Sequence, residues 1–376
     1  MKVIKSKKIL TMKGKEVLEG KYIIVENGII SDIVSKKPEG GEYVDASKMI
    51  VLPSFIDPST SLGLAEEGAG FNYYDSDEST SPSLPQIRAI DAFYPKDPGI
   101  KDAIRGGISY FISSPGPSAV FSGLEGIFSV KGNSADEMVK KFPFALKLNM
   151  NHSARVHWHS QGKFPSTKMG IVALVREKFE KAKYYKKARQ KETDLEMETI
   201  VKVLKGEIPL KVAVNTRDEI EKTLELKREY GVNIILQEAE DSYMVADLLR
   251  QEDIPVIVGP YFTAGRMYHQ RHHYAKYIYS LYEKGILFAL TTCHPVIPIN
   301  YLYFESVLLV KIGIPELDAI RSITANPARI LGMDSEVGTV EIGKKANLAF
   351  LSDDLYSLHS DVIAHMLEGE FVWKNF

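Results

Sequence analysis

Residues 51–64, VLPSFIDPSTSLGL, are the stretch of this 376-residue chain that decides its fold. The stretch begins as an apolar strand and ends in small polar residues. Because side chains alternate across a strand, Ser59 and Ser61 point to the same side of its end. The stretch therefore predicts a buried strand that presents two hydroxyl groups to one site.

Downstream of this strand, short apolar runs alternate with longer helical patterns. Such alternation is typical of a parallel sheet with crossover helices. The predicted strands are 109–113, 144–148, 210–214, 233–237, 256–258 and 287–291. The predicted helices are 165–191, 217–230, 242–251, 263–282 and 316–324. This spacing indicates an α/β fold, a (β/α)₈ TIM barrel over residues 53–335.

Both ends of the chain are rich in short strand patterns. Near the N-terminus, 22–25 and 29–34 flank Asn27-Gly28, which is a hairpin signal, and 49–52 is a further strand. Near the C-terminus the predicted strands are 338–340, 349–351, 362–366 and 369–373. Neither end is apolar enough to fold alone. We expect residues 1–52 and 336–376 to form one small composite β domain, a β-sandwich.

The composition excludes several classes of protein. A net charge of −2, from 47 basic and 49 acidic residues, leaves no electrostatic footprint for nucleic acid. No apolar run reaches the ~20 residues that span a bilayer. The single cysteine, Cys293, cannot form an intramolecular disulfide and fits a reducing cytoplasm. We expect a cytoplasmic protein without nucleic-acid or membrane partners; a small-molecule ligand and a homo-oligomer both stay open.

Several separated motifs carry a family resemblance. They are AIRGGIS at 103–109, SPGPSAV at 114–120, TANPARILG at 324–332 and GTVEIGKKANL at 338–348. In this order they resemble the imidazolonepropionase-like branch of the amidohydrolase superfamily, with Asn347 where Asp is usual. The resemblance implies a TIM barrel that hydrolyses C–N bonds of cyclic amides. It also implies metal ligands, or an acidic group that bridges the metals, after strands one, four, five, six and eight.

At the implied ligand positions this sequence departs from the family. Ser59 and Ser61 stand where the family has two His. The segment TTCHP keeps the family pattern around His294, but Cys293 replaces the Asp that serves as acid and base. The implied substrate pocket comprises Ser59, Ser61, His152 (for Glu), Asn215 (for His), Glu238 (for His) and His294.

These replacements remove the usual chemistry of the family. A hydroxyl is a poor ligand for a transition metal. A thiol with an ordinary pKa near ~8.5 is mostly protonated at neutral pH, so Cys293 is a weak substitute for the catalytic Asp. We therefore expect no standard metal centre and no cofactor.

Three alternatives remain open. His152, Glu238 and Cys293 could form a rebuilt three-ligand site for a divalent metal such as zinc, which would make the chain an active C–N hydrolase. The chain could instead be a non-catalytic scaffold or a partner subunit. His269, His272 and His273 have helical spacing and could hold a metal or phosphate elsewhere.

Overall fold

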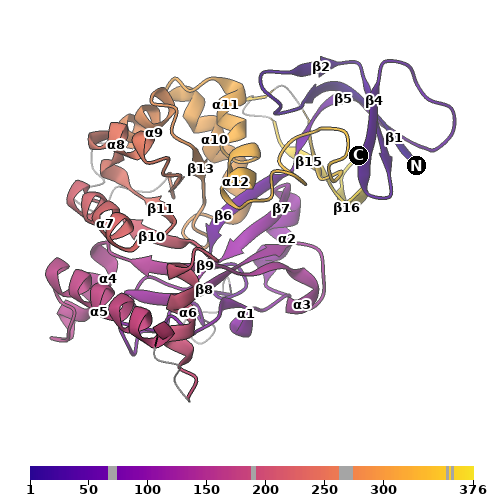
Figure 1. Ribbon diagram of the computed structural model, residues 1–376. Helices are drawn as coiled ribbons and strands as arrows, with labels where there is room; N and C mark the ends of the chain where they lie inside the picture. The colour runs from indigo at the N-terminus through magenta and orange to yellow at the C-terminus, as the bar shows by residue number, and fades with distance from the viewer. Residues whose placement is uncertain (67–73, 188–191, 262–273, 353–354, 357–359) are drawn as a thin grey trace.

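The computed structural model describes residues 1–376 apart from 67–73, 188–191, 262–273, 353–354 and 357–359. The described chain has a mixed α/β fold with two sheets of eight strands each, seen side by side in Figure 1. Among its helices, none is long and apolar enough to cross a membrane.

The first sheet is a nearly closed barrel. Its strands follow the order of the chain: β6 (Phe55–Thr60), β7 (Ile108–Ser113), β8 (Phe121–Ser129), β9 (Val139–Asn149), β10 (Leu210–Val214), β11 (Ile234–Glu238), β12 (Val256–Val258) and β13 (Phe288–Leu290). Side chains join the two ends of this path, because Asp57 accepts hydrogen bonds from Thr291 Oγ1 at 2.5 Å and Thr292 Oγ1 at 2.6 Å. The predicted α/β class is confirmed, and the predicted barrel is present as a nearly closed sheet of eight strands.

Strand β8 is a difference from the sequence-based prediction. It was not expected, and it runs antiparallel to both β7 and β9. The connection from β7, residues 114–120, is too short for a crossover helix, which needs a dozen or more residues. The strand is buried along its whole length and contains Gly123 and Gly126, so it lacks the alternation that marks a strand.

The helices surround the barrel. They are α1 (Ala89–Ala92), α2 (Pro98–Arg105), α3 (Ala135–Met138), α4 (His152–Ser160), α5 (Lys168–Lys187), α6 (Leu195–Leu204), α7 (Arg217–Tyr230), α8 (Ala246–Gln251), α9 (Tyr274–Glu283), α10 (Leu302–Lys311), α11 (Glu316–Arg321) and α12 (Ala325–Ile330), with the 3₁₀ turns η2 (Glu240–Met244) and η4 (Ile299–Tyr301). Helix α7 has the predicted bounds, since a capping box of Thr216 and Glu219 starts it and Gly231, with φ 68°, ends it. The helix predicted over 242–251 is split into η2 and α8.

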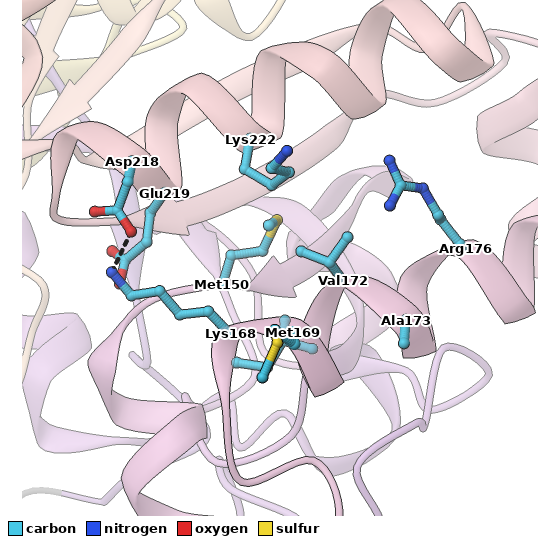
Figure 2. A pocket seen from close by; sticks show the side chains of 10 residues that line it. Met150, Lys168, Met169, Val172, Ala173, Arg176, Asp218, Glu219 and Lys222 are labelled. Atoms are coloured by element: carbon cyan, nitrogen blue, oxygen red, sulfur yellow. Dashed lines mark hydrogen bonds and ion pairs between the residues drawn. The ribbon is translucent and has the colours of Figure 1, made fainter.

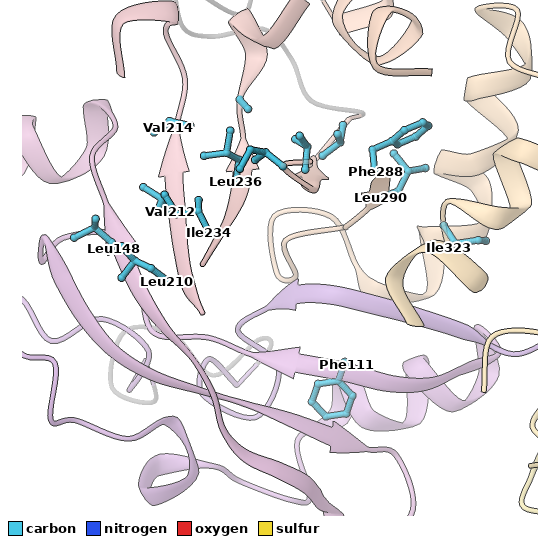
Figure 3. Packing of buried hydrophobic residues seen from close by; sticks show 14 of the residues in the cluster. Phe111, Leu148, Leu210, Val212, Val214, Ile234, Leu236, Phe288, Leu290 and Ile323 are labelled. Carbon is cyan, nitrogen blue, oxygen red and sulfur yellow. The ribbon is translucent and has the colours of Figure 1, made fainter. Parts of the chain in front are cut away.

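Alternation along the barrel strands divides the interior from the helix layer. On β10, Leu210, Val212 and Val214 pack in the main hydrophobic cluster (Figure 3). Helix residues such as Leu224 belong to the same cluster. On β11, Ile235 belongs to a separate cluster with Ile56, Ile112, Ile257 and Ala289. The intervening residue of β10, Lys211, is fully buried and lies on the opposite face from Val212.

Strands from both chain ends pair in the second sheet. Its order is β16 (Glu370–Lys374), β15 (Val362–Leu367), β14 (Leu348–Leu351), β5 (Glu42–Pro53), β1 (Lys2–Leu10), β3 (Tyr22–Glu26) and β4 (Ile29–Val34), and β2 (Val17–Glu19) pairs with β1. The predicted hairpin joins β3 to β4 through Asn27 and Gly28, whose φ values are 50° and 80°. The strand predicted at 338–340 is wrong: Val340 N–H donates one hydrogen bond to Thr11 O, and no ladder forms there. The domain boundaries and the sandwich packing stay predictions.

Candidate functional site

The residues singled out from the sequence lie at one end of the barrel. Ser59 is the penultimate residue of β6, and Glu238 is the last residue of β11. Asn215 follows β10, and Cys293 follows β13. These are the carboxyl ends of strands, the edge at which barrel enzymes place their active sites. His152 begins α4, three residues after the end of β9. We call this end the barrel mouth.

A buried ion pair lies beside Ser59. Lys211 Nζ is 2.7 Å from Glu125 Oε1, and both side chains are 0% exposed. Lys211 Nζ also donates to Ser59 Oγ at 3.1 Å, and Ser59 Oγ donates to Gln237 Oε1 at 3.1 Å. Ser59 is therefore already hydrogen-bonded to two partners, one of them a cation.

Asn215 holds two acidic side chains together. Its Nδ2 donates to Glu238 Oε2 at 2.8 Å and to Glu240 Oε2 at 2.5 Å, and Asn151 Nδ2 donates to Glu238 Oε2 at 3.1 Å. Burial, followed by the charge of Glu238, raises the pKa of Glu240 to about 8. Burial also raises the pKa of Glu238. Glu240 therefore keeps its proton at neutral pH, beside the carboxyl group of Glu238.

The backbone is unusual at the end of β11 and after β13. Glu238, Ala239 and Cys293 have φ values of 70°, 51° and 48°, in the left-handed region that non-glycine residues seldom adopt. Such conformations cost on the order of 1–3 kcal/mol each and cluster at functional sites. They turn the chain so that Glu240, just beyond β11, faces Asn215.

Cys293 and His294 are both poor proton acceptors here. Desolvation, with the nearby charges of Glu238 and Asp57, raises the pKa of the Cys293 thiol, which stays protonated at neutral pH. Burial lowers the pKa of His294 to about 4, so its ring is neutral. Neither ring nitrogen of His294 has a hydrogen-bond partner among the described residues.

The remaining predicted positions do not assemble a ligand set. Ser61 Oγ donates to Ser114 O at 3.4 Å, and His152 Nδ1 lies 3.1 Å from Arg155 Nη2. In the described part of the chain, no three His, Cys, Asp or Glu side chains are grouped so that they could hold a metal ion. His152, Glu238 and Cys293 thus form no such group. His269, His272 and His273 lie outside the described residues.

Sequence reasoning missed four polar residues of the mouth. They are Glu125, Lys147, Lys211 and Glu240. One signal was available: Lys147 and Lys211 each stand in the middle of an apolar run that was predicted to be a buried strand. A lysine at such a position is rare unless it is paired or functional.

A pocket of about 510 Å³ lies on the outer side of the barrel, between α5 and α7 (Figure 2). Met150, Ile171 and Val172 line it, and Lys168 pairs with Asp218 and Glu219 at its rim. It contains none of the residues predicted for the site. Glu219 links it to the mouth, because its Oε2 accepts the N–H of Asn215 at 2.9 Å.

The raised pKa of Glu240 gives a testable pH dependence. The folded protein keeps this proton up to about pH 8, whereas the unfolded chain releases it near the ordinary value of 4.5. Folding therefore takes up a proton in this window, and stability falls as the pH rises through it. Glu240→Gln removes the titration, so we expect the variant to gain stability relative to wild type between pH 5 and 8, measured by urea unfolding. An exposed control, Glu225→Gln, should leave the slope unchanged; a wild-type slope in Glu240→Gln would contradict the assignment.

The chain is similar to several known proteins. The amidohydrolase family matches residues 293–372. A crystal structure of an amidohydrolase from Thermotoga maritima superposes with a TM-score of 0.95 at 28% identity, covering 100% of both chains.

Two curated relatives are also similar in sequence. An amidohydrolase of Hapsidospora irregularis is 22% identical over 92% of this chain, and an imidazolonepropionase of Picrophilus torridus is 44% identical over 13% of it. The chain spans only 39% of the length of the first relative and 12% of the second.

Proposed function

We propose that the chain is a relative of cyclic-amide hydrolases whose barrel mouth lacks the standard metal centre. The relationship is supported by the match of residues 293–372 to the amidohydrolase family and by similar proteins that are amidohydrolases. Its activity toward C–N bonds would then be altered or lost. The observation that carries this proposal is the ammonium group of Lys211 beside Ser59.

The family implies a divalent metal at the mouth, and the side chains present do not fit one. Ser59 stands at the position of a family ligand, yet its Oγ accepts a hydrogen bond from Lys211 Nζ at 3.1 Å. Two unit charges 4 Å apart repel by about 4 kcal/mol at an effective dielectric constant of 20, and a divalent ion doubles this. Asn215 offers an amide whose N–H groups face carboxylates. Lys211 therefore supplies a fixed positive charge in the region where the family uses a metal.

The groups that remain can move protons but are not arranged to activate water in the family manner. Cys293 stands at the position of the family acid and base, and its raised pKa makes the thiol a proton donor at most. Glu240, just beyond β11, keeps a proton because its pKa is raised to about 8. These features support a site whose chemistry differs from the metal-dependent hydrolysis of the family.

The proposal is tested by a hydrolysis panel of five- and six-membered cyclic amides, with wild type and Cys293→Ala. We expect no turnover by either protein above the uncatalysed rate. Turnover by the wild type that Cys293→Ala abolishes would overturn the proposal and make Cys293 a working catalytic group. Turnover that depends on added zinc would instead support a rebuilt metal site.

A further inference from the structure

Lys147 is a second buried lysine at the barrel mouth. It lies on β9, directly opposite Lys211 on β10 in the strand register, and is 7% exposed. Its Nζ donates to Pro115 O at 2.6 Å. Pro115 lies in the loop after β7, so the amine sits at the carboxyl ends of the strands, where Ser59 and Glu238 also lie.

Unlike Lys211, Lys147 has no counter-ion. Glu125, on the adjacent strand β8, is bound to Lys211 Nζ at 2.7 Å and accepts a hydrogen bond from Ser114. Lys147 forms no ion pair with any carboxylate of the described residues, and the partner of its Nζ, Pro115 O, is a neutral carbonyl. A buried ammonium is costly without a paired charge, so such a lysine favours the neutral amine.

The charged and titratable groups around Lys147 act in both directions. Burial and the charge of Lys211, from β10, lower the pKa of Lys147. Glu125 from β8, Glu238 from β11 and Cys293 after β13 oppose this, and the lowering effects prevail. A lysine placed next to another cation and shielded from water is an established way to make an amine nucleophile.

We propose that the barrel mouth binds a small uncharged aldehyde or ketone as a Schiff base on Lys147 Nζ. The nitrogen lone pair attacks the carbonyl carbon, and a proton passes from nitrogen to oxygen to give a carbinolamine. Protonation of that hydroxyl and loss of water then form the C=N bond, so amine and carbonyl give imine and water. No oxidant or reductant takes part.

The charge of the site selects a neutral ligand. Lys211 is the other cation of the mouth among the residues described above, and it is already paired with Glu125 at 2.7 Å. An anionic ligand would thus find no unpaired cation, while it would face Glu238. A neutral carbonyl compound needs no unpaired cation and is not repelled by the charge of Glu238.

The test is reductive trapping on the full chain. The protein is incubated with acetone and sodium cyanoborohydride at pH 7, and each lysine is mapped by peptide mass spectrometry. An ordinary lysine, with a pKa near ~10.4, is neutral in only about one molecule in 2,500 at this pH. We expect Lys147 to be labelled at least about tenfold faster than exposed lysines such as Lys163, because its lowered pKa leaves a larger fraction of this amine neutral at pH 7.

A variant shows whether Lys147 is labelled because its pKa is lowered or only because it is accessible to the reagent. Lys211→Met removes the neighbouring cation that disfavours the ammonium form of Lys147, so the labelling of Lys147 at pH 7 should slow at least about tenfold. Lys163→Met is the matched control and should leave Lys147 labelling unchanged. If Lys211→Met fails to fold, the pH profile of the wild-type rates decides, since the labelling of Lys147 should level off at a lower pH than the labelling of exposed lysines. Labelling of exposed lysines with Lys147 unmodified, or a Lys147 rate that levels off no earlier than theirs, would overturn the proposal. These readouts do not depend on amide hydrolysis, so they fail or succeed apart from the proposed function.

Discussion

Lys211→Met is expected to lower the free energy of unfolding by about 3–5 kcal/mol. The variant leaves Glu125 as a fully buried carboxylate without its counter-ion, and breaking a buried pair in this way costs about that much. Urea unfolding monitored by circular dichroism measures the change.

Two controls show whether the charge is the cause. The double variant Lys211→Met/Glu125→Gln leaves no unpaired charge and should regain most of the loss. Lys13→Met breaks an exposed pair with Glu341, at 3.1 Å, and should cost no more than about 1 kcal/mol. A Lys211→Met effect as small as that of Lys13→Met would show that the buried pair has no such role.

Restoring the family ligands should give tight zinc binding only when Lys211 is also removed. The fivefold variant combines Ser59→His, Ser61→His, Asn215→His, Glu238→His and Cys293→Asp. In it the ammonium of Lys211 still lies beside position 59, and a repulsion of at least about 4 kcal/mol corresponds to nearly 10³-fold in affinity.

We therefore expect the sixfold variant, which adds Lys211→Met, to bind zinc at least about 10³-fold more tightly than the fivefold variant. Competition with a chelator of known affinity measures both constants. Circular dichroism confirms that each variant is folded before it is compared. Equal affinities would mean that Lys211 does not occupy the region of the metal.

Much of the fold could be predicted because local signals are strong where the elements are regular. Strands β10 and β12 and helix α7 have the predicted bounds, and for α7 the capping box and Gly231 fix both ends. Strand β8 could not be predicted, since its glycines and complete burial remove the pattern and its direction depends on the short loop before it.

The candidate site was predictable to the extent that it depends on strand ends. Ser59, Asn215 and Glu238 lie at strand ends of the mouth, as the rule that strands of a barrel end at one edge predicts, and their part in a substrate pocket stays a prediction. The pairing of Lys211 with Glu125 could not be predicted, because the two residues lie on strands separated by β9 and meet only in the closed sheet. Glu240 was missed because its direction depends on the left-handed backbone of Glu238 and Ala239.

The measurement that tests the central claim most directly is the metal content of the wild-type chain. The protein is purified without chelators, dialysed against zinc, then against metal-free buffer, and analysed by inductively coupled plasma mass spectrometry. The fixed charge of Lys211 and the hydroxyl and amide groups at the ligand positions predict substoichiometric zinc, iron and nickel after dialysis. A full equivalent of tightly bound metal, coordinated at the barrel mouth in a crystal structure of the same sample, would contradict the account.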